Sequence, residues 1–512
     1  MRANTVHRWR CAGLALAVLL AAGSGAQASR VAVTNVTWPA AEPRLIRLDL
    51  SWDNSWRGSV EPANWDAVWL FAKVRVGPAG VWRHATLSTA AADYAVADVG
   101  GVAAAFSPSA DGKGVFVYRQ TAGRGPIRWT GVTLRWPSVP PGTDLEVRVF
   151  ALEMVYVPAG PFYLGDGVSP GRFHAGGNPS QPALITDTPP RLRKVDGGLW
   201  AERQGVAANA LGAKGPTWDK PTGVLPAAFP TGYAAFYIQK YEVTQGQYAA
   251  FLNTLAPRQA AARLPTRAEL TVKVSARRRD GAASAAPPPT YRYTVALGAD
   301  GRYAASAPDG ACNYLSWEDA TAFADWAALR PLSESEFEKA CRGSTAQPVP
   351  GEYAWGSTRL STMTDFQGID GSGTETALPG DSNTLCQKSI RGPVRVGIHE
   401  TMPTRELAGA SHYGVLDLSG NVAEAVVLLS SPAGRGFTGV HGDGDLGETG
   451  VADVPLWPGR GGFGSRGGDW TSPEEELRVS ARSATVILPA RRLPGNGFRG
   501  VRSAISDRLP GK

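Results

Sequence analysis

The chain has 512 residues and a formal net charge of +7 at pH 7, with 52 lysines and arginines against 45 acidic residues. This length exceeds what one compact core supports, so we expect two domains. The charge excess is small for so long a chain, and no aromatic residues interleave with its basic cluster at Arg277–Arg279. Composition therefore argues against a protein that binds nucleic acid.

Residues 1–28 have the pattern of a secretory signal peptide. Arginines precede an apolar run from Cys11 to Ala22, and the small residues Ala26-Gln27-Ala28 form a cleavage site. The apolar run is too short to span a membrane, and no second long run follows it. We expect an exported protein, periplasmic or extracellular, whose mature chain has no integral membrane segment.

Residues 29–153 predict an all-β sandwich domain, because short alternating runs such as Ile46–Trp52 and Val68–Val76 are separated by Gly, Pro, Asn and Asp. The tryptophans of this region are Trp38, Trp52, Trp56, Trp65, Trp69, Trp82, Trp129 and Trp136. Large aromatic side chains are mostly buried, so core packing is favoured over a carbohydrate-stacking surface. Exposed aromatics are expected only in the polar stretch Asp53–Asp66.

From Met154 onward, short motifs follow one another in a fixed order. They are Met154–Gly165, Phe236–Tyr248, Asn313–Ala320, Arg330–Gly343, Tyr353–Gly356, Tyr413–Glu424, Arg466–Trp470 and Gly497–Arg502. In that order, over about residues 154–503, they resemble the formylglycine-generating enzyme (FGE-sulfatase, or sulfatase-modifying factor) domain family. The resemblance implies an α+β, C-type-lectin-like fold for residues 154–505, with little regular secondary structure and with bound calcium.

Two stretches interrupt the family pattern. Residues 169–231 and 257–310 are rich in small residues and proline, which predicts surface insertions without core elements. Two helices are predicted, from Ser316 to Leu329 and from Ser333 to Cys341. Ser316 is the N-cap of the first helix, and Ser333 forms a capping box with Glu336 in the second.

The sequence departs from the family pattern in the segment that contains the family's catalytic cysteines. In members that oxidise a sulfatase cysteine, two cysteines shortly after the Gly-Gly-aromatic strand bind copper. Here Thr471–Arg478 contains no cysteine, and neither Ser472 nor Leu477 can act as a soft copper ligand or as a thiolate nucleophile. Copper is therefore not expected, and no catalytic residue is assigned. The candidate cleft residues are Trp470, Ser472, Glu474, Glu476, Arg478 and His412.

Several arginines lie close to these carboxylates in the sequence, namely Arg466, Arg478, Arg482, Arg499 and Arg502. Arginines and carboxylates together could bind a polar group of a peptide or glycan. They could equally form an internal ion-pair network. The sequence leaves both interpretations open.

The resemblance also implies a calcium site at Asn421, Val422 and Glu424, since a hard cation needs several oxygen ligands. A hydrogen-bonded turn without metal is the alternative. The acidic loop His441–Glu448 could bind calcium as well, but it lacks the spacing of a known calcium loop, and a solvated turn is favoured.

Three cysteines remain after the signal peptide: Cys312, Cys341 and Cys386. An exported protein meets oxidising conditions, so one disulfide and one leftover thiol are expected, with the pairing left open.

Two functions follow from these observations. The first is a secreted FGE-sulfatase-domain protein that binds a protein or glycan, or serves as a scaffold, without oxidase activity. The alternative is a formylglycine-generating oxidase that acts on a cysteine of a sulfatase-type substrate.

Overall fold

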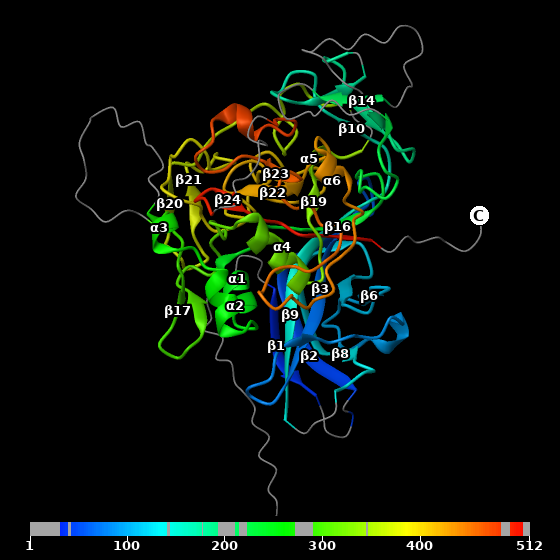
Figure 1. Ribbon diagram of the computed structural model, residues 1–512, viewed down its shortest axis with the longest axis vertical. Coiled ribbons are helices and arrows are strands. Elements are labelled where there is room, and N and C mark those ends of the chain that lie inside the picture. Colours follow the sequence, from blue (N-terminus) through cyan, green and yellow to red (C-terminus); the bar gives the residue numbers. More distant parts are fainter. Residues whose placement is uncertain are drawn as a thin grey trace, which may run out of the picture.

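The computed structural model describes residues 31–38, 42, 44–140, 144–176, 178–192, 210–213, 223–271, 290–344, 347–482 and 492–504. The predicted signal peptide and the basic cluster at Arg277–Arg279 lie outside these residues. The regular secondary structure of the described chain is mostly strand with a few helices, which agrees with the predicted α+β class (Figure 1). Within it, no helix is both long enough and apolar enough to cross a membrane.

Two antiparallel sheets pack together in the N-terminal part. The first has the order β1-β2-β8-β5, with β1 (Ala32–Thr37), β2 (Leu45–Arg57), β8 (Gly123–Arg135) and β5 (Ala95–Asp98). Along β2, buried Ile46, Leu48 and Leu50 alternate with less buried residues, as expected for a sheet with one face on a core. These side chains pack against Val68 and Leu70 of the second sheet.

The second sheet has the order β25-β16-β9-β3-β7-β6, and β4 pairs with β3. Its strands are β25 (Val501–Ser503), β16 (Phe236–Gln239), β9 (Leu145–Val157), β3 (Asp66–Val76), β7 (Val115–Arg119), β6 (Ala104–Pro108) and β4 (Arg83–His84). Strand β3 is buried on both faces. Val68 packs in the core between the two N-terminal sheets, and Trp69 packs in a larger core on the other face of the second sheet. The predicted domain boundary between Glu153 and Met154 falls inside β9, so strands from both sides of the boundary share one sheet.

The tryptophans of this region are mostly core residues. Trp52, Trp69, Trp129 and Trp136 are fully buried, which confirms the core-packing interpretation for them. The expectation of exposed aromatics in Asp53–Asp66 is wrong, because Trp65 is half-buried and stacks on Tyr156 with ring centroids 4.0 Å apart.

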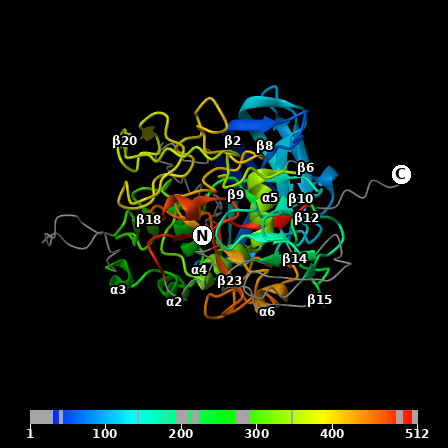
Figure 2. The ribbon, with the colours of Figure 1, turned by 90° about the horizontal axis from the view of Figure 1, so that it is seen from above.

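Of the remaining elements, α5, α6, β14 and β22 lie above these sheets in Figure 1, whereas α1, α2 and β17 lie beside them. The helices are α1 (Gln245–Leu252), α2 (Pro257–Ala262), α3 (Arg267–Leu270), α4 (Trp317–Trp326), α5 (Glu334–Arg342) and α6 (Pro432–Arg435), and the 3-10 turns are η1 (Ala91–Asp93) and η2 (Glu474–Leu477). Both predicted helices are confirmed as α4 and α5, and Ser316 and Ser333 each form a capping box. Seen from above, β2 and β8 lie on one side of the molecule and α2 and α3 on the other (Figure 2).

A four-stranded sheet beside α5 is built from parts of the later motifs of the family pattern. Its strands are β19 (Leu332–Ser333), β22 (Ala423–Val427), β23 (Phe463–Arg466) and β24 (Asn496–Gly497). The smaller sheets contain β10 (Phe162–Leu164) with β12 (Ala183–Ile185), β11 (Phe173–Ala175) with β13 (Arg191–Leu192), β14 (Ala210–Ala213) and β15 (Gly223–Val224), β17 (Val295–Leu297) with β18 (Tyr303–Ala305), and β20 (Asp365–Gln367) with β21 (Thr376–Leu378).

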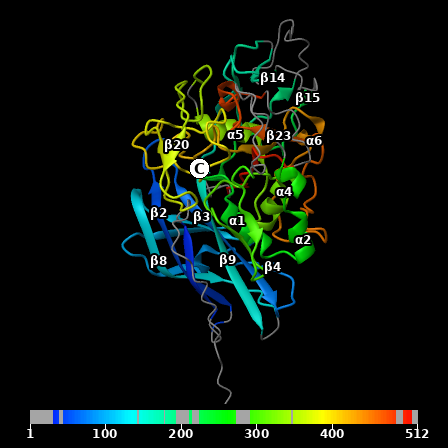
Figure 3. The ribbon, with the colours of Figure 1, turned by 90° about the vertical axis from the view of Figure 1, so that its left-hand side faces the viewer.

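The structure corrects the expectation that residues 169–231 and 257–310 contribute nothing to the core. Phe173, Ile185 and Phe229 of the first segment are buried in the larger core, and so are Tyr291 and Val295 of the second. Apolar side chains placed sparsely among Gly, Pro and Ala are enough to anchor these segments, because each one removes its area from water. Figure 3 shows β14 and β15 of the first segment at the end of the molecule away from β8 and β9.

The expected disulfide is absent, because Cys312, Cys341 and Cys386 are all free thiols. Each thiol is buried in a different hydrophobic cluster, so the described chain brings no two of them together. A disulfide requires Cα atoms within about 7 Å, and three separate core positions do not provide that approach.

Helix α5 carries two buried glutamates that pair with three buried arginines. Glu338 pairs with Arg466 of β23 and, at 2.6 Å, with Arg342 on its own helix. Glu334 pairs with Arg482 at 2.8 Å. Each of these five side chains is 3% exposed or less. Because an unpaired buried charge is costly, these pairs fix β23 and the segment before Arg482 against α5.

We expect Arg466→Met to lower the free energy of unfolding by about 3–5 kcal/mol, because it leaves the Glu338 carboxylate buried with one partner fewer. Urea denaturation followed by circular dichroism measures this change. Arg128→Met is the matched control, since the Arg128 side chain is 57% exposed beside Asp53. The control should change stability by about 1 kcal/mol or less. Equal small effects in both variants would contradict a structural role for the buried network.

Candidate functional site

Two glycines after β23 turn the chain toward η2. Gly467 and Gly468 have φ values of +83° and +68°, in the left-handed region that favours glycine. A Cβ atom on Gly468 would lie 2.8 Å from Leu477 Cδ1 and 3.2 Å from Ser472 Cβ. The side chains of Ser472 and Leu477 therefore both approach Gly468, so the fold brings together two residues of the cysteine-free segment Thr471–Arg478.

Ser472 belongs to a local hydrogen-bond set with two carboxyl residues. Its Oγ accepts from the backbone N–H of Asp469 at 3.1 Å and donates to Glu476 Oε2 at 3.2 Å. Burial raises the pKa of the Asp469 and Glu476 carboxyls. The set contains no imidazole, and Ser472 is itself 7% exposed. This arrangement holds the turn, but it lacks the base that activates a serine nucleophile.

The other candidates on this segment differ in exposure. Glu474 is exposed and its Oε1 accepts from Gln387 Nε2 at 2.7 Å. Arg478 is half-buried, and its guanidinium lies 3.7 Å from the position of a Cβ on Gly351. The structure thus brings Ser472, Glu474 and Glu476 onto one turn, with Gln387 beside them.

Trp470 is a core residue and does not line a cleft. It is 1% exposed, and its Nε1 donates to the Pro494 carbonyl at 2.9 Å. Its backbone N–H donates to the Asn421 carbonyl at 2.9 Å, and its ring packs 5.2 Å from that of Tyr291. The prediction of Trp470 as a cleft residue is therefore corrected. Its buried side chain and its hydrogen bonds to Pro494 and Asn421 fix the start of the turn in the core.

His412 lies at the C-terminal end of α5. Its backbone N–H donates to the Cys341 carbonyl at 2.9 Å, and its ring fills the space that a Cβ on Gly343 would need. Burial, aided by the charges of Arg405 and Lys339, lowers the pKa of His412 to about 4. The imidazole is thus neutral at physiological pH, and its neighbours come from α5 and Arg405, not from the Ser472 turn.

Cys386 lies closer to the turn than its sequence position suggested. It packs in one apolar cluster with Leu477, Tyr353 and Trp355. Burial raises the pKa of the Cys386 thiol to about 11, so the thiol is protonated at physiological pH. The next two residues bond to the turn, since Gln387 N–H donates to the Ser472 carbonyl at 3.0 Å and Lys388 N–H to the Trp470 carbonyl at 2.7 Å. No local sequence pattern encodes this long-range pairing.

The predicted calcium residues fit a cation unequally. Asn421 is engaged by the protein, since its Oδ1 accepts from Val394 N–H at 2.9 Å and its Nδ2 donates to Glu242 at 2.6 Å. Glu424 pairs with Arg499 through Oε1 at 2.9 Å, whereas its Oε2 is buried without a hydrogen-bond partner. The Glu424 Oε2 atom therefore fits the role of a cation ligand, and the Asn421 side chain does not.

Glu242 and Asp417 add two more carboxyl groups near Glu424. Burial raises the pKa of Glu242 and Asp417, and the charges of Asp417 and Glu424 raise that of Glu242 further. Burial also raises the pKa of Glu424 to about 7. Sequence reasoning missed Glu242, although it lies in the Phe236–Tyr248 motif, because only the fold sets it against Asn421.

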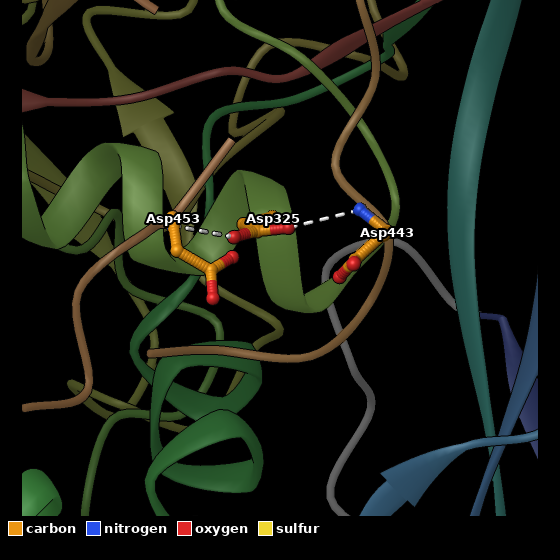
Figure 4. A group of neighbouring side chains, drawn as sticks. All are labelled: Asp325, Asp443 and Asp453. Atoms are coloured by element: carbon orange, nitrogen blue, oxygen red, sulfur yellow. Dashed lines mark hydrogen bonds between the residues drawn. The ribbon is translucent and has the colours of Figure 1, made fainter. Parts of the chain in front are cut away.

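The acidic loop at His441–Glu448 meets α4. Oxygen atoms of Asp325, Asp443 and Asp453 lie within 4.8 Å of one another (Figure 4). Asp325 is buried, and its two oxygens accept the backbone N–H groups of Asp443 at 3.0 Å and Asp453 at 3.3 Å. Asp325 therefore holds the loop through hydrogen bonds, and the other two carboxylates are exposed.

The internal ion-pair interpretation holds for four of the five arginines singled out in the sequence. Arg466, Arg482, Arg499 and Arg502 are 3% exposed or less. Arg502 pairs with Asp111 at 2.6 Å and thereby ties β25 to the N-terminal part. A small pocket is lined by Asn383, Thr384, Leu385, Val394, Ile398, His399, Gly409, Asp417, Ser419 and Asn421. It contains none of the six predicted cleft residues.

Comparison with known proteins places these features in a family. The family described as "Sulfatase-modifying factor enzyme 1-like domain" matches residues 146–504. The chain is 29% identical over 130 residues to the "Inactive C-alpha-formylglycine-generating enzyme 2" of Mus musculus, covering 25% of this chain and 35% of that relative. It is 34% identical over 128 residues to the "Formylglycine-generating enzyme" of Streptomyces coelicolor, covering 24% of this chain and 39% of that relative.

The matched stretches thus span well under half the length of either relative. The family match is broader, since it begins with β9 and ends just after β25. It therefore includes the α5 network, the Ser472 turn and the Glu424 site. The chain belongs to the FGE-sulfatase family.

Proposed function

We propose that this chain is an exported FGE-sulfatase-domain protein that binds a protein or glycan ligand, or serves as a scaffold, without oxidase activity. The observation that carries the proposal is the approach of Ser472 and Leu477 to Gly468 within the cysteine-free segment Thr471–Arg478. These side chains are a hydroxyl and an isobutyl group. Neither group binds copper(I) or forms a thiolate nucleophile. A fold can persist while its chemistry is lost.

The positions of the three described thiols support the same proposal. Cys312, Cys341 and Cys386 lie in separate clusters, and burial raises the pKa of each one. The proximity of Cys386 to Leu477 is the one observation that favours the oxidase alternative. A single protonated thiol supplies neither the second sulfur ligand nor the thiolate, so the binding function is preferred.

We also propose a fold for each part of the chain and a structural calcium ion. The two N-terminal sheets, with a common core of Ile46, Leu50, Val68 and Leu70, support a β-sandwich for residues 29–153. Family membership supports a C-type-lectin-like arrangement of residues 154–505 and a structural calcium ion. The orphaned Glu424 Oε2 and the neighbouring carboxylates of Glu242 and Asp417 support a cation there, and the Val422 carbonyl would add an oxygen.

We expect the purified mature protein to bind no copper(I) in competition with a chromophoric chelator. It should also form no aldehyde on a peptide that carries a sulfatase-type cysteine. The double variant Ser472→Cys with Leu477→Cys should gain one copper(I) site, because the two side chains both approach Gly468. Ser472→Cys alone is the matched control and should not gain this site. Stoichiometric copper in the unmodified protein, or aldehyde formation, would overturn the proposal.

Calcium binding at Glu424 has its own test. Elemental analysis after dialysis should find one calcium ion per chain, and chelation should lower the thermal unfolding midpoint, because a cation that binds only the folded state stabilises it. Glu424→Gln should abolish both effects, whereas Glu474→Gln, at an exposed carboxylate, should leave them unchanged. If the unmodified protein holds no calcium and ignores the chelator, Arg499 alone balances Glu424.

A further inference from the structure

A second group of buried charges joins the N-terminal strands to residues beyond β16. This junction cluster consists of Asp66 at the start of β3, Glu153 in β9, Lys240 directly after β16, and Glu400. Lys240 Nζ donates to Glu153 Oε1 at 2.7 Å and to Glu400 Oε1 at 3.0 Å. The side chains of Lys240, Glu153 and Glu400 are 3%, 2% and 13% exposed, and Asp66 is fully buried. The Lys240 ammonium group therefore pairs with two carboxyl groups and interacts electrostatically with a third, that of Asp66.

The three carboxyl groups differ in their partners. Asp66 accepts three hydrogen bonds from residues of β2, at 2.8–3.2 Å. Glu400 is partly exposed and also accepts from Asn54 Nδ2 at 3.1 Å. Glu153 has only Lys240, because its Oε2 is buried without a hydrogen-bond partner. A buried carboxylate oxygen that nothing solvates is costly, and protonation removes that cost.

We propose that the junction cluster is a proton-binding site centred on Glu153, and that release of its proton as the pH rises loosens the junction between the N-terminal strands and the residues after β16. The step is a simple acid dissociation: the Glu153 O–H bond breaks, the electron pair stays on the carboxylate, and the proton passes to solvent. The ionised cluster then holds three negative charges against one positive charge.

The electrostatic surroundings of Glu153 support this inference. Burial raises the pKa of Glu153 to about 8; Lys240 opposes that shift, and the charges of Asp66 and Glu400 increase it. Burial also raises the pKa of Asp66, to about 6. Tyr241, whose pKa burial holds far above its ordinary value, is the other titratable group coupled to Glu153 and stays neutral.

The direction of the pH effect follows from linkage. A carboxyl group whose pKa is raised on folding adds stability that is fully present below its unfolded pKa and is lost as the pH rises through the folded value. For Glu153 this window extends from its ordinary pKa of 4.5 to about 8. The junction should therefore be firm at mildly acidic pH and weak at mildly alkaline pH.

We expect Glu153→Gln, which mimics the protonated acid, to match the unmodified protein in thermal unfolding midpoint near pH 5 and to exceed it by several degrees near pH 9. Hydrogen exchange, corrected for the intrinsic pH dependence, should show faster exchange in residues 236–242 of the unmodified protein at alkaline pH. The variant should show no such change. Glu146→Gln, on the same strand but 36% exposed, is the matched control and should keep the unmodified pH profile.

If Glu153→Gln lowers the midpoint equally at every pH, Glu153 is ionised throughout and the proposal is wrong. A second variant serves if Glu153→Gln does not fold. Glu400→Gln removes one of the charges that raise the Glu153 pKa, so the pH at which the junction loosens should move downward. An unchanged midpoint of that pH transition would overturn the proposal.

Discussion

The pairing of buried glutamates on α5 with arginines from distant segments is the interaction on which the family domain depends. Glu334 and Glu338 are fully buried, so each must meet a positive charge inside the protein. Arg466 and Arg482 supply those charges from the two ends of the segment that contains the Ser472 turn. The turn is therefore clamped at both ends to one helix, whatever residues it contains.

Other contacts hold the turn in the same place. Trp470 holds the turn from below through its hydrogen bond to Pro494, and Gly467 and Gly468 keep the left-handed conformation that aims the turn. None of these contacts involves the side chains of Ser472 and Leu477. Those two side chains contribute further contacts of their own, since Ser472 bonds to Asp469 and Glu476 and Leu477 is buried beside Cys386.

Local patterns in the sequence predicted the features that local physics determines. The capping residues Ser316 and Ser333 located α4 and α5, because an N-cap and its partner lie within four consecutive residues. The ordered motifs identified the family domain for the same reason. Local patterns could not predict contacts between segments that are far apart in the chain. Examples are the packing of Cys386 beside Leu477 and the hydrogen bond between Glu242 and Asn421.

The failed expectations share that cause. A disulfide was expected because three cysteines remained in an exported chain, but each thiol became a core residue of a different cluster. Trp470 was expected in a cleft because of its motif, yet the Asn421 loop and Tyr291 enclose it. In both cases the expectation rested on the residue type or its motif, whereas tertiary packing determines which residues surround the side chain.

Strand β9 joins the N-terminal strands and the family domain in one continuous sheet. It pairs with β3 from Leu145 to Val155 and with β16 from Met154 to Val157, so the N-terminal strands and the family domain share backbone hydrogen bonds. The same strand carries Glu153 into the junction cluster, and β25 reaches back to Asp111 through Arg502. Because a shared sheet and buried ion pairs must break together, the two parts should unfold as one cooperative unit, and a ligand held by either part would stabilise both.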